Sequence, residues 1–588
     1  MKTIYQYLSV VIGFAAEIII ISLVQLSANI CFSADQPQWG QAGSRNQVSN
    51  EVDLPADFEL PAFDHSVGKF KNLTPGVLFA EQTGDQAHGV PVVADGKVYI
   101  GTNNSVQTDD RFPDNIDYGV FQCRDAQTGN PLWSLFSPKF LTLKYADWWY
   151  IGQCATPVVE KDRLYLVSSN GNVLCLDVNG MANGNDGPFM DELERLFPDE
   201  TEGKSLKPTD ADILWRVNLY EEFDVHQHNC ANCSVLILGD YLYVGTGNGC
   251  EFSHSKTSNP AAPTLVVLDK KTGKAVARDD FKTGAELFHG QWSSPTVYTD
   301  REGRPRIVYG AGNGKLYGFA PFEPGSPWLA PPRSDDDLSE PENDSAAMAA
   351  AADNLSNRHG SENKPNANGS GLPRLRPIWT FNGQPEAQVK DDVPIELGHY
   401  SPSYFVVGCP VFAQGRIYVA VTQNIFHGPN DGWFLCIDPN AALDESGTEP
   451  IPNSDSNSDF SKPKDITRSG LIWSFKPIRA CVSTPAVREG LVYTIGHDGT
   501  LYCLDALTGE EYSQKRLGSP AWGAPLIADG RIYVGTGRRL LYILKEGRNL
   551  ETIAQIRLPY KMMCSPSAAN KTLYILTYGA FYGVKKPF

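Results

Sequence analysis

The chain has 588 residues, of which 41% are hydrophobic and 11% aromatic, enough to build a large core. Its formal net charge of −18 gives an acidic surface, which repels the phosphates of nucleic acid and of anionic membranes. Nucleic acid is therefore excluded as a partner of the folded chain, and so is binding of its surface to anionic membrane.

The first 34 residues differ from the rest of the chain. Lys2 is followed by an apolar run from Tyr7 to about Ile30, which only Glu17 interrupts. A positive start before an apolar segment is typical of an export signal, and the run is also long enough for an uncleaved anchor. Residues 1–34 are therefore interpreted as a signal peptide or an N-terminal anchor. We expect an exported protein of the periplasm or cell envelope, with membrane association through this segment only.

Eight later segments share one pattern: a small residue or Pro, apolar alternation, a polar turn, and a β-rich stretch that contains a tyrosine. The shared tyrosines are Tyr99, Tyr165, Tyr243, Tyr309, Tyr418, Tyr493, Tyr533 and Tyr574. The last three follow one another at 40 and 41 residues, the length of four short strands with their turns. Apolar alternation between Gly and Asp turns is what half-buried antiparallel strands require. The sequence therefore predicts an all-β fold, an eight-bladed β-propeller of four-stranded antiparallel blades.

The propeller is expected to span residues 76–588 as one domain, after an N-terminal extension at 35–75. Gly76–Phe79 (GVLF) stands where a fourth strand would be, with no blade before it. We predict that it pairs with Phe581–Val584 (FYGV) in the last blade and so closes the ring. Closure removes the unpaired edges that an open sheet would expose.

Three long insertions interrupt the repeats. Residues 181–212 contain a short helix-like piece, DELERLF. Residues 322–375 are polar and rich in Pro, Ser and Asn, a composition that cannot bury enough apolar surface to order itself, so we expect disorder there. Residues 440–466 are similar but shorter. All three are interpreted as loops of the propeller.

The repeat register sorts most of the twelve cysteines into two sets. Four lie two residues before an Asp in the third strand of a repeat, where we expect small buried core residues; they are Cys123, Cys175, Cys436 and Cys503. Six others precede the first strand of a repeat: Cys154, Cys230, Cys233, Cys409, Cys481 and Cys564.

The position eleven residues before each tyrosine is the entrance to an innermost strand, and all such entrances open onto one face around the central channel. These positions hold His88, Cys154, Asn232, Val407, Val482, Trp522 and Met563, and Trp292 belongs to the same ring. Convergent polar and aromatic groups on a concave surface are a default binding site. We therefore predict a ligand or cofactor site at His88, Cys154, Trp292, Trp522 and Met563. The alternative is that these side chains only plug the channel.

The segment DVHQHNCANC holds the densest group of potential metal ligands: His226, His228, Cys230 and Cys233. Two imidazoles and two thiolates at this spacing can hold zinc or copper tetrahedrally. An exported location favours instead a disulfide between Cys230 and Cys233, pairing of either with another cysteine of the channel mouth, or structural cysteines.

The loop after Asp177 is rich in oxygen ligands of the kind that calcium prefers: Asn183, Asn185, Asp186, Asp191 and Glu192. Their spacing does not match an EF-hand, and Asn-Gly and Asp-Gly pairs are also ordinary turn formers. Calcium and a turn both remain interpretations of this loop.

Asp125, Thr128, Gly129 and Trp133 fit the pattern A-x-D-x-x-T-G-x-x-x-W, which resembles the tryptophan-docking motif of the pyrroloquinoline quinone (PQQ) dehydrogenase superfamily. The segments QWGQAGSRNQVS, NGNDGPF, HGQWSSP and LDKKTG also resemble those of exported PQQ-like propeller proteins common in planctomycete-type bacteria. The resemblance covers roughly residues 76–588 and implies the propeller fold.

For function, the departures from that superfamily matter more than the likeness. The superfamily's alcohol-oxidising members carry an adjacent Cys–Cys pair above the quinone, and this sequence has no such pair. It also has no C-x-x-C-H for a covalent haem, and PQQ and calcium are not supported by motifs. No catalytic residue is singled out. We expect a binding or scaffold protein whose channel mouth or loops take a protein, a glycan or a small molecule; the alternative is a quinoprotein oxidoreductase of alcohols or sugars.

Overall fold

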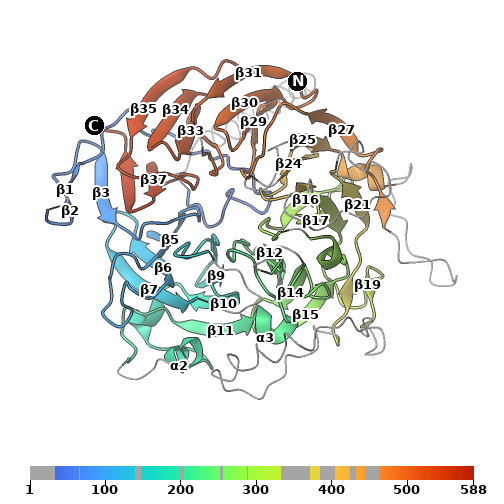
Figure 1. Ribbon diagram of the computed structural model, residues 1–588, viewed down its shortest axis with the longest axis horizontal. Helices are drawn as coiled ribbons and strands as arrows, with labels where there is room; N and C mark the ends of the chain where they lie inside the picture. The colour runs from blue at the N-terminus through green and yellow to red at the C-terminus, as the bar shows by residue number, and fades with distance from the viewer. Residues whose placement is uncertain are drawn as a thin grey trace, which may run out of the picture.

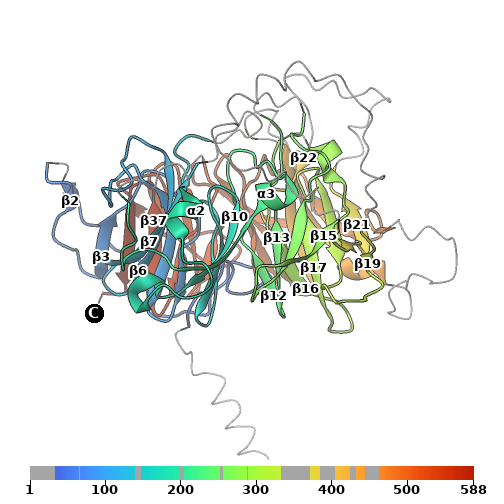
Figure 2. The same cartoon turned by 90° about the horizontal axis from the view of Figure 1, so that it is seen from below.

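The computed structural model describes residues 34–64, 66–139, 148–197, 204–251, 256–287, 289–332, 371–384, 404–423, 425, 432–443, 463–518 and 520–587. Eight antiparallel sheets of four main strands are arranged around a central axis (Figure 1). Seen from the side, the ring is a flattened disc with α3 (Leu219–Phe223) and β22 (Tyr404–Phe405) toward one face (Figure 2). The predicted eight-bladed β-propeller is confirmed.

The first four blades follow one another along the chain, each with its innermost strand first. They are β4 (Val92–Ala94), β5 (Lys97–Asn103), β6 (Tyr118–Asp125) and β7 (Pro131–Pro138); β8 (Val158–Glu160), β9 (Arg163–Val167), β10 (Asn172–Asp177) and β11 (Ile213–Asn218); β12 (Leu236–Leu238), β13 (Tyr241–Gly245), β14 (Leu265–Asp269) and β15 (Ala275–Asp279); and β16 (Thr296–Thr299), β17 (Pro305–Gly310), β18 (Lys315–Phe319) and β21 (Trp379–Asn382).

The other four blades repeat this order, and only the last takes its outer strand from elsewhere. They are β23 (Val411–Ala413), β24 (Arg416–Gln423), β25 (Gly432–Ile437) and β27 (Leu471–Phe475); β28 (Ala486–Arg488), β29 (Leu491–Ile495), β30 (Thr500–Asp505) and β31 (Glu511–Arg516); β32 (Leu526–Ala528), β33 (Arg531–Thr536), β34 (Leu540–Lys545) and β35 (Thr552–Arg557); and β36 (Ser567–Ala569), β37 (Thr572–Thr577), β38 (Ala580–Lys585) and β3 (Val77–Gln82).

Strand β3 closes the ring as predicted. It lies antiparallel to β38 with Val77 opposite Val584 and Gln82 opposite Ala580. Phe79, in the middle of β3, is 3% exposed and packs its ring 5.2 Å from that of Phe581. The first strand of the propeller therefore completes the blade made last.

Short elements extend the blades at their edges. A hairpin of β1 (Phe63–Asp64) and β2 (Lys69–Phe70) precedes β3, and β22 pairs with β24. Beyond β15 lie β20 (Arg374–Leu375) and β19 (Leu329–Ala330), and beyond β21 lies β26 (Lys464–Asp465). Helix α2 (Glu192–Leu196) falls within the predicted DELERLF. The disorder predicted for 322–375, and the similar loop at 440–466, fall mainly on residues 333–370 and 444–462, which lie outside the described residues.

The shared tyrosines and the third-strand cysteines form the middle of the blades. All eight tyrosines are at most 3% exposed. Cys123, Cys175, Cys436 and Cys503 lie directly opposite a tyrosine in the neighbouring strand and are at most 2% exposed. The prediction of small buried core residues is confirmed for these four.

Adjacent blades are joined by an aromatic ring that rests on a glycine turn of the next blade. Trp473, on β27, packs against Gly509, and its Nε1 donates to Ala506 O at 3.2 Å. Trp133 and Trp215 donate in the same way to Val178 O and Lys270 O. The turn needs glycine because its φ is positive and because the indole occupies the place of a Cβ.

Residues 36–49, here called the channel segment, run through the middle of the ring, where Figure 1 shows the blue N-terminal stretch. They hydrogen-bond to the innermost strand, or to the residues just before it, in every blade. The pairs are Gln36 with Val93 and Ala568, Pro37 with Val159, Gly43 with Val297, Ser44 with Phe412, Arg45 with Ser234 and Val235, Asn46 with Val487, and Gln47 with Ile527.

No helix of the described residues is long and apolar enough to cross a membrane. The signal or anchor predicted at 1–34 lies, except for Ala34, outside the part of the chain that the structure describes.

Candidate ligand-binding site at the channel mouth

The entrances to the eight innermost strands surround one cavity of about 150 Å³, a volume comparable to that of a cavity that accepts a benzene ring. Every blade contributes to its wall. The eight entrance residues predicted from the register all line it: His88, Cys154, Asn232, Trp292, Val407, Val482, Trp522 and Met563. The channel segment adds Trp39 to the wall, while neighbouring residues of that segment bond to the innermost strands themselves.

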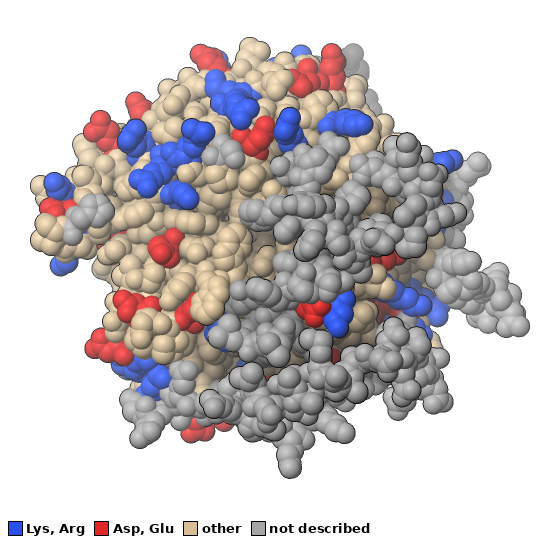
Figure 3. Space-filling model, in the orientation of Figure 1, with Lys and Arg blue, Asp and Glu red and all other residues tan. Residues whose placement is uncertain are grey.

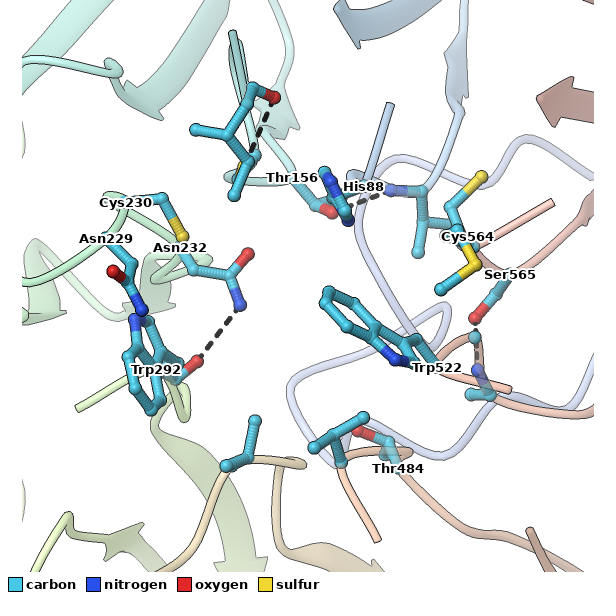
Figure 4. A pocket seen from close by; sticks show the side chains of 18 of the residues that line it. His88, Thr156, Asn229, Cys230, Asn232, Trp292, Thr484, Trp522, Cys564 and Ser565 are labelled. Atoms are coloured by element: carbon cyan, nitrogen blue, oxygen red, sulfur yellow. Dashed lines mark hydrogen bonds between the residues drawn. The ribbon is translucent and has the colours of Figure 1, made fainter. Parts of the chain in front are cut away.

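Four indole rings dominate the wall. Trp292 and Trp522 come from the entrances of the fourth and seventh blades and lie on opposite sides of the cavity (Figure 4). Trp292 is held by a bond from its Nε1 to His228 O (3.0 Å) and packs 5.1 Å from His289. Trp148 lies 6.4 Å from the ring of Trp522 and is 39% exposed, so it stands at the solvent end.

Hydroxyl groups form a second, polar layer in the wall. Thr156, Thr484 and Ser565 each accept a hydrogen bond from a main-chain N–H of the preceding blade. Such a hydroxyl still carries a proton of its own to donate. The bonds fix the three groups in place, so the cavity presents oriented neutral donors between its aromatic rings.

The described lining contains no Asp, Glu, Lys or Arg. Its imidazole at His88 accepts from or donates to Tyr578 Oη at 2.9 Å and lies 5.5 Å from the Trp522 ring. Burial, with Lys139 adding to it, lowers the pKa of His88 to about 4. The imidazole is therefore uncharged at neutral pH, and burial raises the pKa of the Cys564 thiol to about 12, which keeps it protonated. The described wall of the cavity is therefore aromatic and polar, and it carries no carboxylate, ammonium or guanidinium group.

The structure thus brings together all five residues of the predicted site, from five different blades. Sequence reasoning missed Trp39, Trp148 and the hydroxyl layer. The hydroxyls had a signal, since Thr156, Thr484 and Ser565 each stand directly before the Pro of a repeat. Trp39 lies in the segment QWGQAGSRNQVS, which was noted only for its resemblance to a family, and Trp148 lies in no repeat.

The structure does not gather the four predicted zinc or copper ligands around one point. His226 Nε2 is bonded to Asp224 at 3.0 Å, and His228 Nδ1 to Cys250 O at 2.8 Å. Cys230 faces the cavity. Among the described residues, the group of three or more His, Cys, Asp or Glu side chains that could share an ion is a different one. A metal at this quartet stays a prediction without geometric support.

Of the alternatives for Cys230 and Cys233, the disulfide is wrong, because both are free thiols. Cys233 is buried inside the third blade, where its Sγ accepts from Gly245 N at 3.1 Å. Cys230 is part of the cavity wall and is only partly buried. Cys233 is therefore a core residue of the third blade, whereas Cys230 belongs to the cavity wall.

A family model described as outer membrane protein assembly factor BamB, of the PQQ-repeat type, matches residues 465–553. That stretch runs from the end of β26, at the edge of the fourth blade, through the last strand of the fifth blade and into the last strand of the seventh. The chain is therefore an eight-bladed β-propeller in which residues 465–553 are similar to PQQ-type repeats. No curated protein matches its sequence.

Solved structures with similar architecture include two from named bacteria. BamB from Moraxella catarrhalis is 12% identical, with a TM-score of 0.42 over 86% of this chain and 96% of that one. A quinohemoprotein alcohol dehydrogenase from Comamonas testosteroni is 13% identical, with a TM-score of 0.42 over 94% and 81%. A europium-containing methanol dehydrogenase is 10% identical, with a TM-score of 0.48 over 92% and 89%. These likenesses concern the propeller fold alone and indicate no activity for this chain.

The channel-mouth residues do not fit PQQ. The quinone carries three carboxylates, and burying such charges without a partner is strongly unfavourable. The described lining offers no Lys or Arg to pair with them, and no Asp or Glu to hold a calcium ion beside them. No chemical step through PQQ is therefore derived for this cavity.

Proposed function

We propose that the protein is an exported binding protein whose channel mouth takes a neutral, ring-shaped unit of a glycan. The observation that carries this proposal is the cavity itself, in which indole rings from the fourth and seventh blades enclose fixed, uncharged hydrogen-bonding groups. Apolar ring faces with a few precisely oriented polar groups are what recognise a small ligand with both CH and OH surfaces.

Neutrality and position support this ligand class. A neutral wall favours an uncharged ligand over an acid or an amine, since either would lose its hydration without gaining a counter-charge. The outer part of the same face carries interspersed acidic and basic side chains (Figure 3), so longer parts of a glycan would meet a mixed polar surface. The apolar N-terminal run supports export.

Binding of neutral sugars by the full-length protein tests the proposal. We expect a screen of neutral mono- and oligosaccharides to yield a ligand that isothermal titration calorimetry can follow. Trp292→Ala and Trp522→Ala should each weaken it about tenfold or more, or at least 1.4 kcal/mol, and the double variant should abolish it. Trp149→Ala is the matched control, because Trp149 is 66% exposed and does not line the cavity.

Two results would count against this function: no neutral sugar binds, or the double variant binds as well as the parent. The second would mean that the indoles only fill the channel. Reconstitution with PQQ and calcium, followed by a dye-linked alcohol or sugar oxidation assay, tests the quinoprotein alternative. Oxidation that depends on added PQQ would replace the binding role by catalysis.

A further inference from the structure

A second group of polar side chains lies in the 181–212 insertion of the second blade, away from the channel mouth. Carboxylate oxygens of Asp177, Asp186 and Asp212 lie within 4.8 Å of one another. Asp177 ends β10, Asp212 directly precedes β11, and Asp186 lies in the loop after the short helix η1 (Gly180–Asn183). The two ends of the insertion therefore meet at these carboxylates.

Two further side chains complete the group. Asn185 neighbours Asp186, and Glu192 begins α2. Asn185 Nδ2 donates to Glu192 Oε2 at 3.1 Å, and the Glu192 charge acts on Asp212. Three carboxylates thus converge, with Glu192 and Asn185 beside them, and Arg163 lies next to the group with its Nη1 3.6 Å from Asp177 Oδ2.

Each carboxylate of this group has one oxygen that accepts a hydrogen bond from the protein. Asp177 accepts from Asn179 N, Asp186 from Asn183 Nδ2, Asp212 from Asp186 N, and Glu192 from Asn185. The other oxygens of Asp212 and Glu192, and Oδ1 of Asn185, are buried and have no hydrogen-bond partner among the described residues.

Buried oxygens without partners are costly, and buried like charges more so. Asp212 is fully buried and Glu192 is 3% exposed. Burial raises the pKa of Asp212 to about 6, and repulsion from Glu192, Asp177 and Asp186 adds to the rise. Without a cation this arrangement works against the fold.

We propose that Asp177, Asn185, Asp186, Glu192 and Asp212 bind one calcium ion. All five donors are hard oxygens, and a mixture of several carboxylates with an amide oxygen suits the larger, flexible coordination sphere of Ca²⁺. Mg²⁺ demands a small octahedron, keeps most of its water and is usually held by one or two carboxylates. The protein donors on the opposite oxygens act as an outer shell that orients the ligands.

The ion would fasten the insertion to its blade. Leu196 and Phe197, just past the ligand Glu192, are buried in the core cluster that the first three blades share. Phe197 packs 5.1 Å from Phe112, which stacks on Phe136 of β7. Calcium at the neck of the insertion therefore holds an apolar cap over the joint between blades one and two.

The experiment uses the full-length protein, stripped with EDTA and then titrated with Ca²⁺ or Mg²⁺ by calorimetry. We expect one Ca²⁺ per chain, with Mg²⁺ about tenfold weaker or more. Asp212→Asn and Glu192→Gln should each weaken Ca²⁺ binding about tenfold or more. Glu194→Gln is the matched control: it makes the same change two residues further on in α2, on an exposed side chain, and should leave binding unchanged.

Thermal melting gives a second readout, because the difference in melting temperature between the variant and the parent should change sign when Ca²⁺ is added. In EDTA, Asp212→Asn should melt at or above the temperature of the parent, because one of four crowded charges is gone while Asn can still accept from Asp186 N. With Ca²⁺ present the parent should gain stability by ligand linkage and melt above the variant. A purely structural role for Asp212 would lower the melting temperature equally in both buffers.

Three results would overturn the proposal: no Ca²⁺ binding up to about 10 mM, well above the weakest protein sites; binding that both Asp212→Asn and Glu192→Gln retain; or Mg²⁺ binding as tight as that of Ca²⁺. None of them bears on sugar binding at the channel mouth, which the indole variants test separately.

Discussion

Arg45 shows how a single residue joins parts of the chain far apart in sequence. It is fully buried, and its guanidinium donates to main-chain carbonyls: Nε to Pro295 O at 3.1 Å, and Nη2 to Ser234 O and Val235 O at 2.9 Å each. Burial lowers its pKa, while the nearby thiols of Cys409 and Cys233 act in the opposite direction. The planar fork of arginine suits several acceptors at fixed angles.

Arg45→Ala is expected to cost roughly 3 kcal/mol or more, because it leaves buried carbonyls of two blades without donors. Arg45→Lys should recover only part of this stability, since an ammonium cannot span the three acceptors. Thermal melting of the two variants checks the order, with the exposed Arg301→Ala as control. Equal melting temperatures for the parent and Arg45→Ala would show that the guanidinium is dispensable.

At the scale of the element, the turn between the third and fourth strands of a blade is the place where an aromatic ring of the preceding blade packs. In the sixth blade this turn holds Gly509, with φ of 75°, and a Cβ there would lie 2.6 Å from the Trp473 ring. The turn between the first two strands of the same blade holds Gly490, with a similar φ of 79° and nothing within 4 Å of such a Cβ. The two glycines have similar backbone conformations and differ only in whether a side chain at that position would meet a neighbour.

Gly490→Ala should therefore cost about 1–2 kcal/mol, the price of a left-handed conformation alone. Gly509→Ala should cost a further 1–3 kcal/mol or so, because the methyl group displaces the indole. Comparison of the two melting temperatures isolates the packing contribution. A cost for Gly509→Ala no greater than that for Gly490→Ala would argue against the docked indole as the link between blades.

At the scale of the whole molecule, the ring is closed by strand pairing and by one more docked aromatic ring. Phe79 of β3 lies against Gly129 of the first blade, where a Cβ would be 2.5 Å from its ring. It thus takes at the closing joint the place that tryptophan takes between other blades. The last blade is bonded to the first as well, through Tyr574 Oη to Ala126 O at 3.1 Å.

Phe79→Ala is expected to cost about 3–5 kcal/mol, as for other buried aromatic truncations, and to open the ring to proteases. Leu78→Ala, on the partly buried face of the same strand, should cost less. Melting temperature and limited proteolysis of the two variants give the comparison. If both were cleaved at the rate of the parent, closure would not depend on this ring.

The repeat made most of this architecture predictable. Each tyrosine fixes the register of its blade, so counting back eleven residues found entrance residues such as His88 and Trp522 before any contact was known. Trp39 and Asp212 were not predicted as site residues, for two different reasons. Trp39 lies outside every repeat, and Asp212 is separated from Asp177 by an insertion that only the folded chain brings back. The Cys230–Cys233 disulfide was wrong because compartment and spacing say nothing about which way two side chains turn.

The channel segment also sets an order in time. Gln36 is made among the first described residues, yet its side chain accepts from the main chain of Ala568, 532 positions later. A chain that emerges from its N-terminus first must hold this segment without its full set of partners until the eighth blade exists. Contacts of such separation form slowly. The central packing is consequently a late event that follows synthesis of the whole chain, and a protein shortened by its last blade would lose the bonds to Ala568 and Pro566 that anchor both ends of the segment.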